Sequence, residues 1–201
     1  MDPRHPYEQL SLFAAGLLLA LWLIGLHCVM LAKPNLTQAW LKKFPRNATS
    51  GQVILGIGLA WFWLLIAPDG MGKLSALQMD LGEFNNAKPL LRLIVPAALV
   101  AVAISVRDFL AVRALGLLGL MVAAPLLQAA FLKDPTSRLL IPIFAYAMLT
   151  ASLFMVGMPY LFRDLVTWVT ASGKRWNAFA IAGLLYGVAT LVCAVSFWRG
   201  Y

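Results

Sequence analysis

Few side chains in this sequence have the types and spacing that enzyme or transport chemistry requires. All eight acidic residues lie outside the middle of the long apolar runs, where a proton- or sodium-coupled transporter commonly keeps a carboxylate. The chain has no paired carboxylates within such a run, and it has no HExxH, GxSxG, CxxC or P-loop motif. We therefore predict no catalytic residue, no metal site and no enzyme activity.

His27 is the histidine that lies within an apolar run, and an imidazole there could bind the metal of a haem or a chlorin. A bis-histidine haem needs a second ligand, and His5 lies outside the runs. His27 is therefore the candidate cofactor ligand, although a hydrogen bond to a partner, simple packing or an interfacial position would also explain it. For the chain as a whole, we predict no bound cofactor.

Two segments of the chain follow the same frame, in which Pro comes four residues after Arg and the segment closes on Arg-Asp. The frame consists of Arg92, Pro96, Arg107 and Asp108 in the first segment, and of Arg138, Pro142, Arg163 and Asp164 in the second. It predicts a parallel repeat of two helical hairpins, residues 88–132 and 133–198, with each Pro in or just beyond a first helical turn. Chance is the alternative, because Arg and Pro are common where helices enter a membrane.

The two Arg-Asp pairs predict a link between these hairpins. Adjacent residues do not face each other on a helix, so we expect Asp108 to pair with Arg163 and Asp164 to pair with Arg107. The alternative is that each Arg reaches the headgroups independently while each Asp caps a helix.

A seam of small residues runs along the last apolar segment with alternating spacings of three and four. It consists of Ala180, Gly183, Gly187, Thr190 and Ala194, and it contains a GxxxG motif. Such a seam lets the backbone of another helix approach closely, which favours association in lipid. The approaching helix could belong to the same chain or to another subunit. A shorter seam, Gly116, Gly119 and Ala123, lies in the fourth apolar segment.

The elements that position these residues are predicted to be membrane helices. The chain has 201 residues, of which 62% are hydrophobic and 12% charged, whereas soluble domains carry about 25% charged residues. Apolar runs of the length needed to span a bilayer cover about residues 10–32, 52–67, 90–106, 110–132, 139–162 and 177–198. The predicted fold is all-α, a polytopic integral membrane bundle of about six transmembrane helices in a single domain.

Three connections have the amphipathic pattern of segments that lie at a membrane surface. Residues 36–44 combine aromatic residues with lysines. Residues 71–84 place Leu74, Leu77, Leu81 and Phe84 at helical spacing. Residues 163–176 carry Trp168 and Trp176, which we expect at headgroup level. Ordinary loops or contacts with a partner subunit are the alternatives.

The net charge of +8 comes from 16 Lys and Arg that are scattered among the connections, so we expect no nucleic-acid partner. If both termini lie on one side of the membrane, the first, third and fifth connections between the predicted spans lie on the opposite side. Those three connections hold nine of the positive charges, and the side of the termini holds seven. The positive-inside rule then places the termini on the non-cytoplasmic side, and we expect a bacterial inner membrane.

The absence of recognisable chemistry, together with the seams and amphipathic connections, predicts a non-catalytic integral membrane subunit that packs within a larger assembly. Its partners are the lipid bilayer and other membrane subunits or further copies of itself. A small uncoupled channel or transporter, acting as a homo-oligomer, is the first alternative. Its polar path would use Gln128, Tyr146, Thr150 and Ser152. An interfacial lipid-modifying enzyme that uses the two Arg-Asp pairs is the second.

Overall fold

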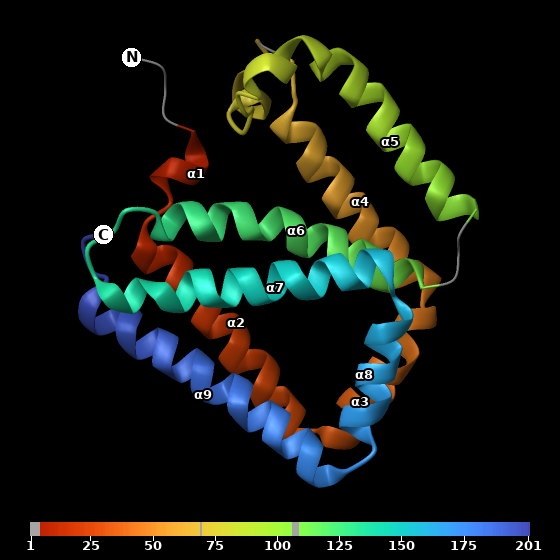
Figure 1. Ribbon diagram of the computed structural model, residues 1–201, viewed down its shortest axis with the longest axis vertical. Coiled ribbons are helices and arrows are strands. Elements are labelled where there is room, and N and C mark those ends of the chain that lie inside the picture. The colour runs from red at the N-terminus through yellow and green to blue at the C-terminus, as the bar shows by residue number, and fades with distance from the viewer. Residues whose placement is uncertain (1–4, 69, 106–108) are drawn as a thin grey trace.

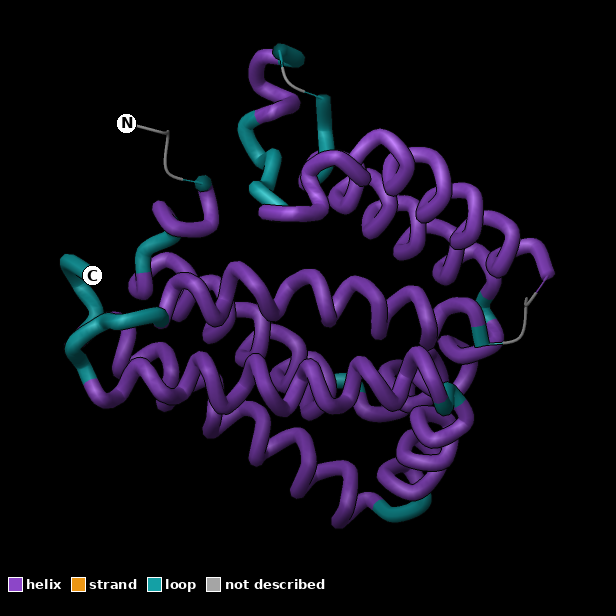
Figure 2. Tube along the Cα trace, turned by 45° about the horizontal axis from the view of Figure 1, so that its top comes forward, coloured by secondary structure: helices purple, strands orange, loops and turns teal. Residues whose placement is uncertain are grey.

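The computed structural model describes residues 5–68, 70–105 and 109–201. These residues form helices and connections without a strand, which confirms the predicted all-α fold (Figure 2). Among the described residues, five helices are long and apolar enough to cross a membrane: α2 (Leu12–Ala32), α4 (Ala48–Leu65), α6 (Leu110–Ala130), α7 (Leu140–Gly157, counted with the preceding turn from Thr136) and α9 (Gly173–Phe197). At 1.5 Å per residue, the 21 residues of α2 extend about 31 Å, close to the thickness of a bilayer core.

The remaining elements are α5 (Lys88–Ser105), which has 18 residues like α4, and shorter helices and turns. The shorter ones are α1 (Pro6–Gln9), α3 (Pro34–Lys43), α8 (Tyr160–Thr170) and the 3-10 turns η1 (Phe44–Arg46), η2 (Gly72–Ser75), η3 (Gly82–Ala87) and η4 (Thr136–Leu139). Helix α5 covers the third predicted span, but it is not among the five spans found in the described residues. It begins at Lys88, so Pro96 lies inside the helix rather than in its first turn, whereas Pro142 lies in the first turn of α7 as predicted.

Local side chains explain where the first two long helices begin. The Ser11 hydroxyl accepts a hydrogen bond from the backbone N–H of Ala14, and the Asn47 side chain accepts one from Ser50. Both residues thereby cap donors that the first turn of a helix leaves unpaired. The caps fix the start of α2 at Leu12 and the start of α4 at Ala48.

Three helix pairs hold the bundle together: α2 with α9, α6 with α7, and α4 with α6 (Figure 1). Helix α5 contacts α4 and η3 but is packed much less extensively than these pairs. Helices α3 and α8 lie against each other at the end of the bundle where α9 begins. The tightest pairs therefore do not follow the order of the two predicted hairpins, and the internal repeat stays a prediction.

The fifth predicted span, residues 139–162, is divided in the structure. Helix α7 ends at Gly157, and α8 begins at Tyr160 after Pro159. Proline has no backbone N–H and disfavours helical geometry in the residue before it, so the helix does not continue through this point. The chain turns there, and α8 leaves the direction of α7 (Figure 1).

The predicted amphipathic helix over residues 71–84 is wrong, because two short 3-10 turns occupy this connection instead. Gly72 and Gly82 have φ values of +60° and +56°, which interrupt a right-handed helix. Leu74 and Phe84 are exposed. The other two amphipathic segments do form helices, α3 and α8.

Candidate functional site

The predicted seam on α9 faces α2 of the same chain. A Cβ atom built on Gly183 would lie 2.0 Å from Nε2 of His27, and one on Gly187 would lie 3.0 Å from the Leu23 side chain. The other three members of the seam are fully buried: Ala180, Thr190 and Ala194. Glycine thus lets α2 approach within a distance that any side chain at Gly183 would prevent.

His27 is buried in this contact, with 5% of its surface exposed. Its Nδ1 lies 2.7 Å from the carbonyl oxygen of Leu23 one turn earlier, and its ring lies 6.2 Å from that of Phe179. The ring rests on the backbone of α9 at Gly183. The structure therefore gives the predicted cofactor candidate a packing role between two helices.

Two tryptophans join the ends of α9 to α2. The indole N–H of Trp176, at the start of α9, donates to the carbonyl oxygen of Met30 at 3.1 Å, and the ring is 1% exposed. Trp198, just beyond the other end, is completely buried and covers Gly16, where a Cβ atom would lie 2.3 Å from the indole ring. Trp176 is buried between helices, whereas Trp168 is 56% exposed, and the predicted headgroup level of both stays a prediction.

The shorter seam on α6 faces α7. A Cβ atom on Gly116 would lie 2.8 Å from the Ser152 carbonyl oxygen, and one on Gly119 would lie 2.3 Å from the Ser152 hydroxyl. Ala123 is also buried. Ser152 is thus enclosed between two helices, while Tyr146 and Thr150 are exposed on α7. The structure therefore places Ser152 in a helix contact, apart from Tyr146 and Thr150, which share an exposed stretch of α7.

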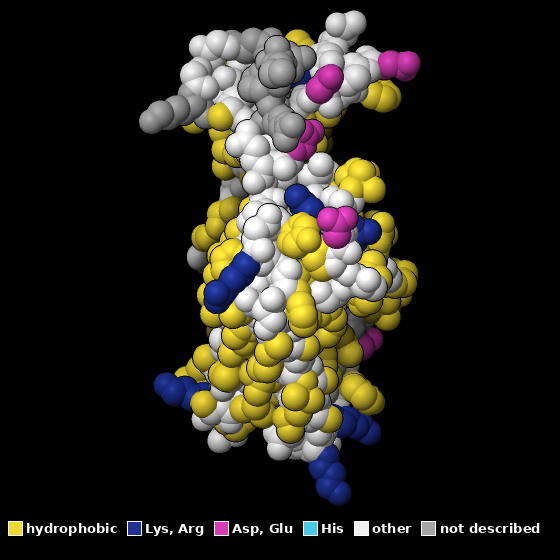
Figure 3. All heavy atoms as spheres, turned by 90° about the vertical axis from the view of Figure 1, so that its left-hand side faces the viewer, with side chains coloured by type: hydrophobic (Ala, Val, Ile, Leu, Met, Phe, Trp, Pro, Cys, Tyr) yellow, Lys and Arg dark blue, Asp and Glu magenta, His cyan; other side chains and the backbone are white. Residues whose placement is uncertain are grey.

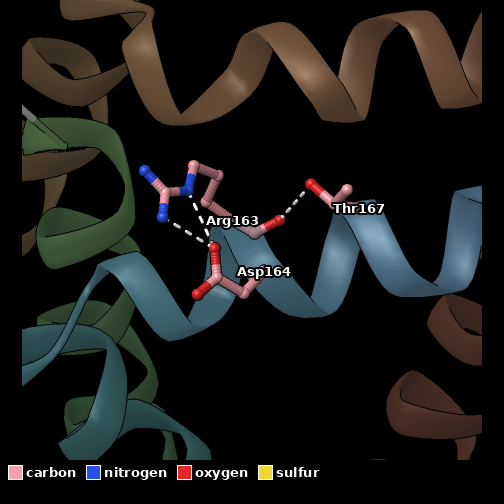
Figure 4. Close-up of polar contacts among 3 residues, drawn as sticks. All are labelled: Arg163, Asp164 and Thr167. Atoms are coloured by element: carbon pink, nitrogen blue, oxygen red, sulfur yellow. Dashed lines mark hydrogen bonds and ion pairs between the residues drawn. The ribbon is translucent and has the colours of Figure 1, made fainter.

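Arg163 and Asp164 pair with each other on α8 (Figure 4). Nη2 and Nε of Arg163 lie 2.8 and 2.9 Å from one carboxylate oxygen of Asp164. Both side chains are about half exposed, so the pair stabilises the fold by at most about 1 kcal/mol. The Arg163 guanidinium also lies 5.9 Å from the ring centroid of Phe109 at the start of α6. Arg107 and Asp108 lie outside the described residues, so the predicted cross-pairing stays a prediction, but its premise that adjacent residues do not pair is wrong for Arg163 and Asp164.

A polar cavity of about 760 Å³ lies where α4 ends and α5 begins. Its lining consists of Pro68, Gln78, Met79, Asp80, Asn85, Asn86, Lys88, Pro89 and Arg92. Asp80 accepts hydrogen bonds from the Asn85 side chain and from the Gly82 backbone N–H, and these bonds lower the pKa of its carboxyl group. The residues of the cavity come from the single connection between α4 and α5 and from the start of α5. Sequence reasoning missed the cavity because it predicted an amphipathic helix in that connection, where the structure has two 3-10 turns.

A second cavity of about 470 Å³ lies between α4, α5 and the start of α6, and its lining is mostly apolar. Leu55, Leu59, Val100 and Ile104 contribute to it. Among the described residues, no three His, Cys, Asp or Glu side chains lie together in a group that could hold a metal ion.

The fold and these sites define an all-α membrane bundle in which a glycine seam on α9 packs closely against α2. Comparison of the chain with protein-family models, with known proteins and with solved structures gives no significant match.

Proposed function

We propose that this chain is a multi-pass, non-catalytic subunit of a larger membrane assembly, and that α7 faces a partner. The supporting observation is the position of Tyr146. It lies in the middle of the Thr136–Gly157 span, its side chain is 61% exposed, and its hydroxyl group has no hydrogen-bond partner among the described residues. A hydroxyl in the lipid core without a partner is unfavourable, and tyrosine is normally enriched at the membrane boundaries instead.

The residues around Tyr146 favour a neighbouring helix over lipid. Ala147, Thr150 and Ala151 are exposed on the same stretch of α7, and the Thr150 hydroxyl donates to the Tyr146 carbonyl oxygen at 2.9 Å. Small residues beside a free hydroxyl provide both close approach and a hydrogen-bonding group. A second copy of the chain would satisfy the same surface, which is the arrangement required by the alternative, a homo-oligomeric channel.

Photocrosslinking in cells tests which partner α7 meets. A photoreactive phenylalanine derivative replaces Tyr146 in one variant and Ile57, which is 54% exposed on α4, in the control. We expect position 146 to give a discrete adduct with another membrane protein and position 57 to give none. An adduct of twice the chain mass would favour the homo-oligomer. Equal labelling of lipid at both positions would contradict the subunit proposal.

We also propose that the end formed by α3 and α8 faces the cytoplasm and that both termini face the opposite side. Lys42, Lys43, Lys174 and Arg175 lie at the α3–α8 end, whereas the described acidic residues other than Asp164 lie in connections and termini at the other end. On the face drawn in Figure 3, most Asp and Glu side chains lie in the upper part, Lys and Arg side chains lie at several heights, and the lowest part carries Lys and Arg. Basic connections favour the cytoplasmic side.

Cysteine labelling tests this orientation. In a variant with Cys28 and Cys193 replaced by serine, a Lys43→Cys substitution should react with a membrane-impermeant maleimide only after the cells are opened. An Arg199→Cys substitution in the same background should react in intact spheroplasts, because it lies at the opposite end. The reverse pattern would place the termini in the cytoplasm.

A further inference from the structure

We propose that helices α3 and α8 together form a surface that binds anionic phospholipids of the membrane. The two helices lie against each other, and they connect α2 to α4 and α7 to α9 (Figure 1). With 10 and 11 residues they extend about 15–17 Å, which is too little to span a bilayer. This surface belongs to other helices than the exposed face of α7, so it does not depend on the partner proposed there.

Helix α8 has two apolar faces, and the bundle covers one of them. Val166 and Val169 are buried. Leu161, Leu165 and Trp168 are spaced by four and three residues, so they share another face of the helix. They are 38%, 50% and 56% exposed. Three large apolar residues on one uncovered face indicate contact with lipid or with another protein.

Helix α3 has the same arrangement. Leu41 packs against the buried cluster that contains Val169 of α8. Leu36 and Trp40 are four residues apart and therefore share a face, and they are 65% and 56% exposed. Each of the two helices thus packs one apolar face against the bundle and leaves a second apolar face uncovered.

The charges around the uncovered faces indicate the kind of lipid. Residues 33–46 and 160–176 contain seven Lys and Arg but only one acidic residue, Asp164, and Asp164 pairs with Arg163. The other six cations are exposed and form no ion pair with any described residue: Lys33, Lys42, Lys43, Arg46, Lys174 and Arg175. Such a concentration of unpaired positive charge attracts headgroups that carry a negative charge.

Arg175 joins a cation directly to an uncovered apolar face. Its guanidinium carbon lies 4.7 Å from the centroid of the Trp168 ring, and its Nη1 donates to the Trp168 carbonyl oxygen at 3.4 Å. Tryptophan rings and arginine side chains both favour the boundary between acyl chains and headgroups. The contact therefore holds a positive charge where the phosphate of a lipid would lie if the ring contacts its acyl chains.

The position of the two helices favours lipid over a protein partner. Helix α3 follows the end of α2, and α8 precedes the start of α9. Both α2 and α9 are long and apolar enough to cross a membrane, so their ends reach the headgroup level. Amphipathic helices at this level bind the bilayer through their apolar area and through attraction of their cations to anionic lipids.

Quenching of a fluorophore by brominated lipids tests the surface in the full-length protein, reconstituted in nanodiscs of equimolar phosphatidylcholine and phosphatidylglycerol. A bimane fluorophore is attached to Leu165→Cys on the uncovered face or to Thr167→Cys on the polar face of α8, with Cys28 and Cys193 replaced by serine. Bromine is carried by the acyl chains of phosphatidylcholine in one preparation and by those of phosphatidylglycerol in the other.

We expect both brominated lipids to quench position 165 more than position 167, and phosphatidylglycerol to quench position 165 more than phosphatidylcholine. Replacing the exposed Lys42 and Lys43 by glutamine should lower the local ratio of phosphatidylglycerol to phosphatidylcholine by about fivefold, the fold-change that corresponds to about 1 kcal/mol. The control variant Lys133→Gln with Arg199→Gln removes two charges from outside α3 and α8 and should leave the ratio unchanged.

Three results would overturn the proposal. Stronger quenching of position 165 by iodide in the aqueous phase than by brominated lipid would show that the face meets water, as a face reserved for a protein partner would. Equal quenching of position 165 by the two brominated lipids would remove the preference for anionic headgroups. An equal fall of the local lipid ratio in both double variants would show that the preference does not come from α3.

Discussion

A Gly183→Ala substitution should destabilise the purified protein by about 2 kcal/mol, the middle of the range for overpacking a tight contact. The new methyl carbon would lie 2.0 Å from Nε2 of His27, far inside van der Waals contact. The imidazole cannot easily turn away, because its Nδ1–H donates a hydrogen bond to the Leu23 carbonyl oxygen and its ring is buried. Helices α2 and α9 must therefore separate. The midpoint of thermal unfolding in detergent measures the effect.

A Gly25→Ala substitution is the matched control, since Gly25 also lies within α2 but has no atom within 4 Å of a built Cβ. It should leave the midpoint unchanged or raise it slightly, because alanine favours helix more than glycine. Truncation of His27, the other residue in the clash, should relieve it. The double variant Gly183→Ala with His27→Ala should be more stable than additivity predicts. If Gly183→Ala and Gly25→Ala behave alike, the seam is not the close contact that the structure describes.

The seam itself was predictable from the sequence, but its partner was not. The spacing of Gly183 and Gly187 defines one face of a helix whatever it meets. The choice of α2 depends on shape, because His27 and Leu23 together fit the surface that the two glycines leave open. The sequence left open whether this face met the same chain or another, and that choice depends on contacts between residues more than 150 positions apart.

Other features were missed because a local pattern had two meanings. The sequence places Trp176 near the end of a membrane helix, but it does not show that the indole N–H donates to the Met30 carbonyl oxygen or that the ring is buried in the contact with α2. The apolar run through residues 139–162 reads as one span, although Gly157 and Pro159 carry the signal that ends α7. Composition predicted the membrane bundle, while tertiary contacts determined where individual residues lie.

The second large effect is expected at Trp198. A Trp198→Ala substitution should destabilise the protein by about 3–5 kcal/mol, as measured for large aromatic residues truncated in closed cores. The indole is completely buried over Gly16, and its N–H donates to the Ser137 hydroxyl at 2.9 Å. It therefore joins the start of α2, the end of α9 and the η4 turn before α7. Its loss should lower the unfolding midpoint and expose the η4 connection to protease.

Trp40→Ala provides the control, because Trp40 is 56% exposed on α3 and should affect the unfolding midpoint little. A Trp198→Phe variant separates the two contributions of the indole. Phenylalanine retains most of the packing over Gly16 but cannot donate to Ser137, so it should recover most of the stability that alanine loses. Ser137→Ala removes the acceptor of the same hydrogen bond, so it should lower the unfolding midpoint by about as much as Trp198→Phe does. Equal unfolding midpoints for Trp198→Ala and Trp40→Ala would show that the end of α9 does not close the bundle.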